Sequence, residues 1–238
     1  MTEASEAASS TDAPGARLLD LVEIMDRLRI SCPWDRQQTH SSLLRYLLEE
    51  AYEAAEAIEA EDHAAMREEL GDVLFQVFFH ARVAAERSAA EGGFTIDDVA
   101  ETLAAKLIRR HPHVFGSVSV SSADEVNANW EEIKQAERAA KAQASDADAA
   151  PSALDGVPFG QPALSLAAQL QRRAARAGYP LDDVADVAPA ADDAEAAFGQ
   201  ELMRVVARAQ AAGVDPELAL RTAARRFAGQ VRAREQRS

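Results

Sequence analysis

The segment that decides the fold is residues 39–81, THSSLLRYLLEEAYEAAEAIEAEDHAAMREELGDVLFQVFFHA. Its first part is expected to form a helix over residues 39–60, because Thr39 can cap it and apolar residues recur at helical spacing. A turn at Glu61-Asp62 leads into a second helix, expected over about residues 63–90. The apolar arc of the first helix, about 120° wide, carries Leu44, Leu47, Leu48, Ala51, Ala55 and Ile58.

The sequence on either side of this segment is also typical of helices. Thr95 with Asp98 and Ser122 with Glu125 resemble capping boxes, and Pro216 suits the first helical position. With 53 alanines and no convincing strand, the chain is predicted to be all-α and bundle-like. The further helices are expected at 16–30, 95–110, 122–143, 161–177, 192–212 and 215–235.

The acidic charge lies in one part of the chain. Residues 1–150 contain 29 acidic and 14 basic residues, whereas residues 151–238 contain 11 of each. A protein with this charge repels nucleic acid polymers and membrane surfaces, so neither is expected as a partner. The single cysteine, Cys32, excludes an intramolecular disulfide and a cysteine-based zinc cluster, and favours the cytoplasm.

The composition also predicts the domain organisation. Residues 1–15 contain no Lys or Arg and no apolar stretch, so a disordered tail is expected rather than a signal peptide. Residues 16–143 are expected to form the first domain. Residues 144–160, rich in Ala, Asp, Ser, Pro and Gly, are the candidate linker, and residues 161–238 form a second helical region.

Two pairs of carboxylates occur at helical spacing in the first domain. Glu50 and Glu53 are three residues apart on the first long helix, and Glu69 and Asp72 are three apart on the second. Glu69, Asp72 and Gln76 form the only polar strip on a helix that is otherwise apolar over 70–79 and is expected to be buried almost all round. A buried carboxylate needs a partner, and a divalent cation such as Mg²⁺ would serve. The alternative is a solvated helix edge.

Other residues suit binding to an anion or a nucleotide. Lys106, Arg109 and Arg110 cluster at the end of one helix, where they can bind phosphates or simply complement the helix dipole. Trp34 and Trp130 can stack on a base, although packing between helices is the alternative for both. His80 lies near the polar strip and is interpreted as a core histidine.

Six segments of the chain are distinctive when they are taken together and in order. They are Cys32-Pro-Trp-Asp35, Thr39-His40, LLEEAYE (47–53), EELGDVLFQVFFHA (68–81), KLIRRHPHVFG (106–116) and NWEEIKQAE (129–137). Over about residues 16–160 they resemble the MazG family of nucleoside triphosphate pyrophosphohydrolases. The signature of that superfamily, EExxE followed by ExxD, is present as Glu49-Glu50-x-x-Glu53 and Glu69-x-x-Asp72.

The resemblance implies a helical bundle that assembles as an intertwined homodimer. It also implies hydrolysis of NTPs, often dNTPs and non-canonical ones, to the NMP and pyrophosphate, with Mg²⁺ or alternatively Mn²⁺ as cofactor. By that resemblance Glu50, Glu53, Glu69 and Asp72 hold the metal and Glu49 assists the attacking water. Lys106, Arg109, Arg110 and Trp130 then bind the substrate, with Trp34 as a further candidate.

The C-terminal region resembles a second MazG copy without its chemistry. Phe198-Gly199-Gln200-Glu201 stands where ExxD is expected, and no EExxE helix precedes it. The first copy is therefore the expected site of activity. Two alternatives stay open: a relative specialised for dUTP or phosphoribosyl-ATP, and a non-catalytic helical regulator that binds nucleotides or a partner protein.

Overall fold

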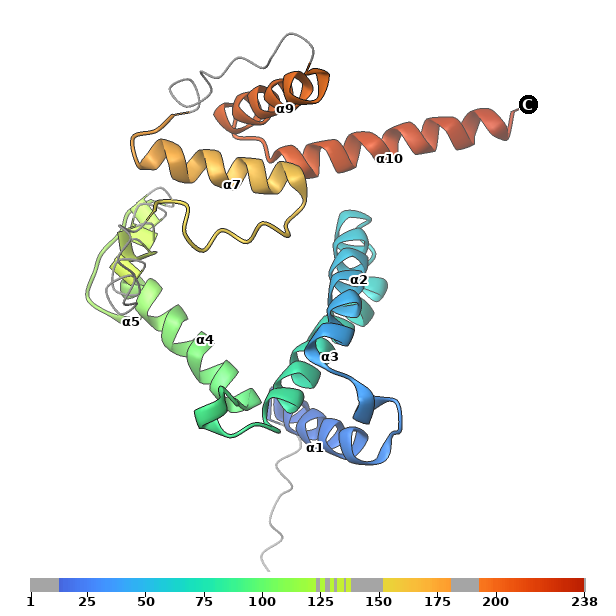
Figure 1. The fold of residues 1–238 in the computed structure, drawn as a ribbon, viewed down its shortest axis with the longest axis vertical. Helices are drawn as coiled ribbons and strands as arrows, with labels where there is room; N and C mark the ends of the chain where they lie inside the picture. The colour runs from blue at the N-terminus through green and yellow to red at the C-terminus, as the bar shows by residue number, and fades with distance from the viewer. Residues whose placement is uncertain are drawn as a thin grey trace, which may run out of the picture. The chain divides into compact units, whose positions relative to one another are not determined.

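The computed structural model describes residues 13–122, 125–126, 129–130, 132–134, 136–137, 152–180 and 193–237. These residues contain helices and no strand, which confirms the all-α prediction (Figure 1). The chain forms two compact units, residues 1–133 and 134–238. Most of the predicted tail, the first half of the predicted linker and much of the predicted helix over 122–143 lie outside the described residues.

The first unit is built around a helical hairpin. Among the described helices, α2 and α3 make the most extensive contact with each other (Figure 1). Residues 60–62 join them. The helices of this unit are α1 (Ala16–Ser31), α2 (His40–Glu59), α3 (His63–Ala84), α4 (Ile96–Arg110) and the short α5 (Pro112–Phe115), with 3₁₀ turns η2 (Asp35–Gln37) and η3 (Ala89–Glu91).

A side-chain cap fixes the start of each helix of the hairpin. Thr39 begins α2 as predicted, since its hydroxyl accepts a hydrogen bond from the backbone N–H of Ser42 at 3.2 Å. Asp62 begins α3, and its Oδ1 accepts from the N–H groups of Ala64 and Ala65 at 3.0 and 3.1 Å. Packing of α2 against α3 then brings their facing carboxylates together.

The predicted end of α3 near residue 90 is wrong, because the helix stops at Ala84. Ser88 and Glu91 form a separate capping box, in which the Ser88 N–H donates to Glu91 at 3.1 Å and the chain enters η3. The Thr95–Asp98 capping box at the start of α4 is confirmed. Local capping thus overrides the alanine-rich continuation of the helical pattern.

The core of the first unit consists of Met25, Leu43, Phe78 and Phe79, with partly buried Tyr46 and its neighbours around it. The side of α2 that is buried is therefore the side of Leu43, at 0% exposed. The predicted apolar arc lies elsewhere on the helix: Leu44, Leu48 and Ile58 are 53%, 49% and 52% exposed.

Helix α3 is likewise not buried all round within one chain. Leu70 and Val77 are 49% and 37% exposed, so the prediction for residues 70–79 is wrong for the single chain. The physical reason is that α1, α2 and α4 cover only part of its surface. Both long helices of the hairpin thus present a second apolar face to solvent.

A buried arginine ties the segment after α1 to the bundle. Arg29 is 8% exposed and donates to both carboxylate oxygens of Glu86, at 2.7 and 2.9 Å. It also donates to the backbone carbonyls of Asp35 and Gln38, the latter at 3.0 Å. The guanidinium therefore fixes the conformation of residues 32–38, which lead into α2.

Replacing this arginine is expected to destabilise the fold. Arg29→Ala removes a buried guanidinium that donates to two backbone carbonyls and to Glu86, so urea unfolding should show a loss of about 2–4 kcal/mol. Arg17→Ala is the matched control, because its ion pair with Asp20 is exposed on both sides, and it should cost at most about 0.5 kcal/mol. Equal stability of the two variants would contradict the structural role of Arg29.

The second unit contains α7 (Ala163–Arg176), α9 (Ala194–Ala211) and α10 (Pro216–Glu235) among its described residues. Val206, at 0% exposed, is the largest fully buried side chain among its described residues. Gln171 connects two helices, since its amide donates to the Met203 carbonyl at 2.8 Å and its oxygen accepts from Gln210 at 2.8 Å. Asp215 caps α10 as predicted, by accepting from the Leu218 N–H at 3.0 Å.

Candidate active site

The position of Glu50 follows from the periodicity of α2. At 3.6 residues per turn, Glu50 lies within about 20° of Leu43 on the helix surface, between that core residue and buried Ala54 and Ala57. Glu50 therefore faces α3 and is half-buried. Glu53 lies about 80° from Leu43 and Glu49 about 120° from it, so these two carboxylates are progressively further from the helix interface.

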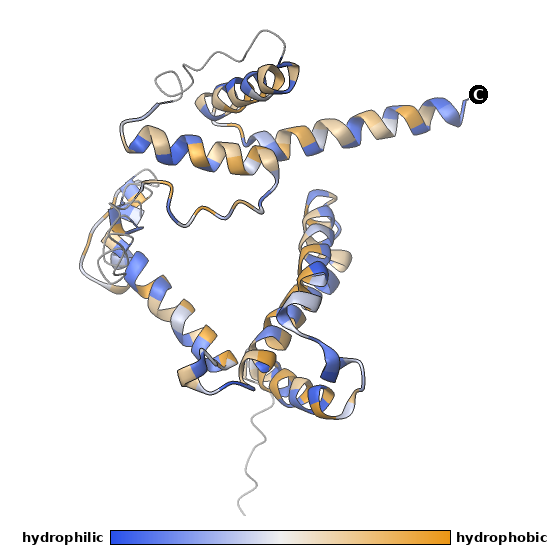
Figure 2. Ribbon diagram, in the orientation of Figure 1, coloured by the Kyte–Doolittle hydropathy of each residue, from blue (hydrophilic) through white to orange (hydrophobic). Residues whose placement is uncertain are grey.

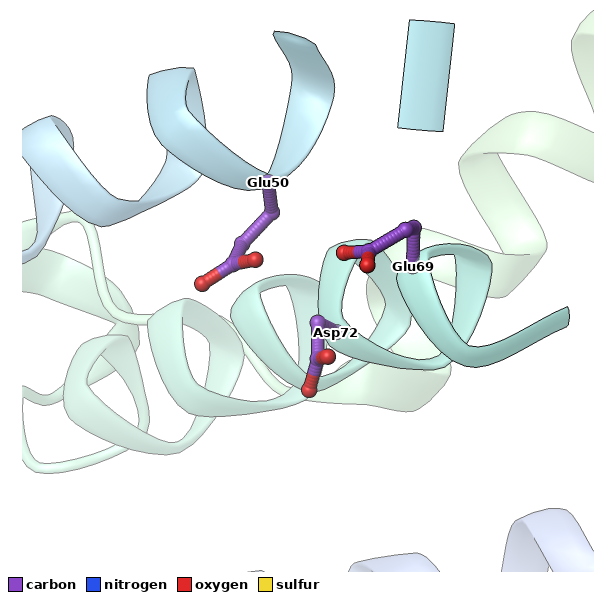
Figure 3. Close-up of side chains that lie close together, drawn as sticks. All are labelled: Glu50, Glu69 and Asp72. Atoms are coloured by element: carbon purple, nitrogen blue, oxygen red, sulfur yellow. The ribbon is translucent and has the colours of Figure 1, made fainter. Parts of the chain in front are cut away.

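The polar strip of α3 faces this carboxylate. Glu69 and Asp72 are less than one turn apart, and Glu69 is half-buried. One carboxylate oxygen from each of Glu50, Glu69 and Asp72 lies within 4.8 Å of the other two. Figure 3 shows Glu50 reaching from α2 toward α3, and Glu69 pointing from α3 toward Glu50. The hairpin thus brings three carboxylates from two helices close together.

The cluster makes its own members harder to ionise. Burial raises the pKa of Glu50 above its ordinary value, and the charges of Asp72 and Glu53 raise it further. Burial also raises the pKa of Glu69, followed by the charge of Glu53. Among the residues that the structure describes, none of the three clustered carboxylates forms an ion pair. A cation bound between them would relieve this repulsion.

The donor set suits a hard divalent cation. All three groups offer carboxylate oxygens, the ligands that Mg²⁺ and Mn²⁺ prefer. Of the four predicted ligands, Glu50, Glu69 and Asp72 are brought together, whereas Glu53 lies outside this group and acts on Glu69 through its charge. Glu49 is exposed on α2 beside them.

The predicted phosphate-binding residues lie at the end of α4. Lys106 and Arg110 are half-buried and Arg109 is exposed. Trp130 is half-buried close to this end of the helix, because its ring contacts His111 edge-on, with centroids 5.0 Å apart. The Nδ1–H of His111 donates to the Leu107 carbonyl at 2.6 Å, which fixes the imidazole against α4. The fold therefore groups the basic residues and this tryptophan around His111.

Trp34 occupies a different environment. Its ring packs edge-on against Tyr46 and Phe79, with centroid distances of 5.8 and 6.3 Å, and the residue is 47% exposed. One edge of the indole thus belongs to the core and the other reaches solvent. This environment accommodates packing, and a role in substrate binding stays a prediction.

His80 has a partner that the sequence analysis did not identify. Its Nδ1 lies 2.8 Å from Nδ1 of His40, at the start of α2, and the two rings stack at 6° with centroids 5.2 Å apart. Two imidazoles that share one hydrogen bond cannot both be protonated without strong repulsion. Burial lowers the pKa of His80, and the charge of His40 lowers it further.

This histidine pair predicts a loss of stability in acid. Since the folded protein holds His80 at a lowered pKa, the unfolded chain takes up its proton first, and the free energy of unfolding falls as the pH drops below about 6.5. His40→Ala removes one cause of the shift, so the pKa of His80 should rise toward its ordinary value. Urea unfolding at pH 7.5 and 5.5 should then show a smaller pH effect than wild type.

The matched control for His40→Ala is His63→Ala, because His63 is exposed at the start of α3. That variant should keep the pH dependence of the wild type. At pH 7.5, His40→Ala should also cost about 1 kcal/mol for the lost hydrogen bond. If His40→Ala loses as much stability between pH 7.5 and pH 5.5 as the wild type does, groups other than this histidine pair cause the loss.

The first unit of the chain matches a known protein family. A family model described as the MazG nucleotide pyrophosphohydrolase domain matches residues 38–115, which include the hairpin and α4. No described helix is long and apolar enough to span a membrane.

Three relatives cover most of the chain. It is 46% identical over 226 residues to an uncharacterized 26.1 kDa protein of Streptomyces cacaoi, covering 95% of this chain and 86% of that protein. It is 42% identical to the nucleoside triphosphate pyrophosphohydrolase/pyrophosphatase MazG of Thermotoga maritima, covering 87% and 81%. It is 49% identical to a nucleoside triphosphate pyrophosphohydrolase of Mycolicibacterium smegmatis, covering 71% of this chain and about half (49%) of that protein.

The matched segment carries every carboxylate of the cluster, and the Thermotoga maritima relative is matched over most of its length. The chain therefore belongs to the MazG nucleotide pyrophosphohydrolase family.

Proposed function

We propose that the chain hydrolyses nucleoside triphosphates, including dNTPs and non-canonical ones, to the nucleoside monophosphate and pyrophosphate. The observation that carries this proposal is the convergence of Glu50, Glu69 and Asp72 within 4.8 Å on two adjacent helices. Relatives that share this segment are named as nucleoside triphosphate pyrophosphohydrolases. These three carboxylates are a candidate metal site. Among the described residues, no other group of three or more His, Cys, Asp or Glu side chains is arranged so that it could hold a metal ion.

The proposed cofactor is Mg²⁺, with Mn²⁺ as an alternative, held by Glu50, Glu69 and Asp72. Glu53, which is close enough to Glu69 to raise its pKa, is proposed as the fourth ligand. When bound, the metal supplies charge neutralisation of the triphosphate and lowers the pKa of a coordinated water. The three carboxylates are proposed to determine where the positive charge of the metal lies.

The residues around the cluster are proposed to position the reaction. Water attacks the α-phosphorus, the bond from that phosphorus to the bridging oxygen breaks, and pyrophosphate leaves with the bond electrons. Glu49 is exposed next to Glu50 and is proposed to orient the water and take its proton. Lys106, Arg109 and Arg110 are proposed to bind the phosphates, which accumulate charge as the bond breaks.

The exposed apolar face of the hairpin supports assembly as a homodimer. Leu44, Leu48, Tyr52 and Leu70 are each about half exposed, and Figure 2 shows hydrophobic positions along the whole hairpin and along α4. Burying such residues against a second copy removes them from water. Sedimentation equilibrium tests this proposal, and a monomer at micromolar concentration would contradict it.

The domain assignment is also a proposal. The catalytic domain is assigned to residues 16–143, and residues 161–238 to a degenerate second copy. In that second region Phe198 is 66% exposed on α9, where the ExxD carboxylate pattern is absent. A helical regulator that binds nucleotides without turnover is the second candidate function, and this second unit would suit it.

The decisive experiment is pyrophosphate release from a panel of NTPs and dNTPs, with Mg²⁺ and with EDTA. The panel includes dUTP, which separates a general enzyme from a dUTP-specific relative, and phosphoribosyl-ATP. We expect release that requires the metal. A folded protein that binds nucleotides but releases no pyrophosphate from any of them would favour the regulator.

A further inference from the structure

Gln76 is a buried polar residue whose oxygen lacks a partner. The residue is 4% exposed, and its Oε1 accepts no hydrogen bond from the part of the chain that the structure describes. A buried acceptor without a donor destabilises a fold, so native proteins rarely retain one without a ligand or water to satisfy it. The position of this oxygen indicates what the donor is.

Gln76 extends the carboxylate strip of α3 by one turn. At 3.6 residues per turn its side chain leaves the helix between the directions of Glu69 and Asp72, about 6 Å further along the axis than Asp72. It therefore belongs to the same face of α3 as two members of the carboxylate cluster. Those neighbours are acceptors when ionised, so they cannot donate to the amide oxygen.

Gln171 shows how the same chain treats a buried glutamine with a structural role. It is 8% exposed, and both ends of its amide are satisfied: it donates to the Met203 carbonyl and accepts from Gln210, each at 2.8 Å. The fold can thus supply partners to a buried amide. The unpartnered oxygen of Gln76 belongs instead to a residue on the face of α3 that carries Glu69 and Asp72.

We propose that Gln76 is a positioning residue of the metal site, whose Oε1 accepts a hydrogen bond from a water molecule bound to the divalent cation. This inference rests on the proposed function, in which Glu50, Glu69 and Asp72 hold that cation. Mg²⁺ and Mn²⁺ keep several waters when few protein groups coordinate them, and the metal polarises the O–H bonds of those waters. A metal-bound water is therefore the strong donor that the amide oxygen lacks.

The test is Mn²⁺ binding without nucleotide, measured by electron paramagnetic resonance on the full chain. Gln76→Met keeps the length of the side chain and removes the acceptor. It should weaken Mn²⁺ binding roughly tenfold, as loss of an outer-shell partner typically does. The urea midpoint of the metal-free protein should stay the same or rise, because an unsatisfied buried oxygen has gone.

Two further variants make the result specific. Gln76→Glu keeps an acceptor in place and should bind Mn²⁺ at least as tightly as wild type, even if the metal-free fold is weaker. Gln171→Met removes a satisfied amide in the other unit, so it should lower the urea midpoint and leave Mn²⁺ affinity unchanged.

The inference is overturned if Gln76→Met binds Mn²⁺ as wild type does, or if Gln76→Met and Gln76→Glu weaken binding equally, since packing would then explain both. It is also overturned if the metal-free Gln76→Met protein is clearly destabilised, because the oxygen would then have a partner within the fold. A wild type that binds no Mn²⁺ overturns the proposed metal site itself, which separates that failure from failure of this inference.

Discussion

Asp72→Asn is expected to reduce metal-dependent pyrophosphate release by about a hundred- to a thousandfold. The change keeps the shape of the side chain and removes one of the three charges that converge within 4.8 Å. Because the cation must neutralise a triphosphate, the loss of one ligand charge weakens both metal binding and stabilisation of the transition state. The measurement is pyrophosphate release at saturating substrate over a series of Mg²⁺ concentrations.

The fold of this variant should survive. The charge of Asp72 raises the pKa of Glu50 and of Glu69, so its removal relieves repulsion in the metal-free protein. The urea midpoint without metal should therefore equal or exceed that of wild type. Glu56→Gln is the matched control, since Glu56 is exposed on the same helix as Glu50 and outside the cluster. Full activity in Asp72→Asn would refute the assignment of the metal site.

Much of the hairpin could be predicted from local sequence signals. Thr39 and the Thr95–Asp98 pair act within one turn of the chain, so their capping roles were predictable without knowledge of the fold. The end of α3 was not, because alanine-rich residues continue the helical pattern past Ala84 and the Ser88–Glu91 box competes with it. The three-residue spacing within the Glu50/Glu53 pair and within the Glu69/Asp72 pair indicated a shared site. Packing of α2 against α3 brings Glu50, Glu69 and Asp72 together.

Contacts between distant residues were harder to predict. The Arg29–Glu86 pair joins residues 57 positions apart, and His40 meets His80 across the hairpin, so no local spacing signals either pair. The side of α2 that is buried in the single chain was not predicted either. Leu43 and Leu44 are adjacent and equally apolar, and only packing against α3 decides which one is covered.

A divalent cation is expected to stabilise the protein at pH 7.5 and much less at pH 5. The folded, metal-free protein holds Glu50 and Glu69 at raised pKa values, mainly through burial and then through neighbouring charges. These groups therefore contribute stability at low pH, and that contribution is lost as the pH rises through their raised pKa values. A cation favours the ionised carboxylates, so protons compete with it in acid.

Thermal or urea unfolding with and without Mg²⁺ measures this competition. With the cation at a hundred times its dissociation constant, the gain at pH 7.5 should be about 2.7 kcal/mol, and the same concentration should add little at pH 5. Glu50→Gln provides the control, since it removes one proposed metal ligand and, with it, one carboxyl group whose pKa is raised. That variant should gain little from Mg²⁺ at either pH, and its metal-free stability should change less between them. Equal stabilisation of wild type at both pH values would place the bound cation away from Glu50 and Glu69, because only carboxylates with raised pKa values make its binding sensitive to protons in this range.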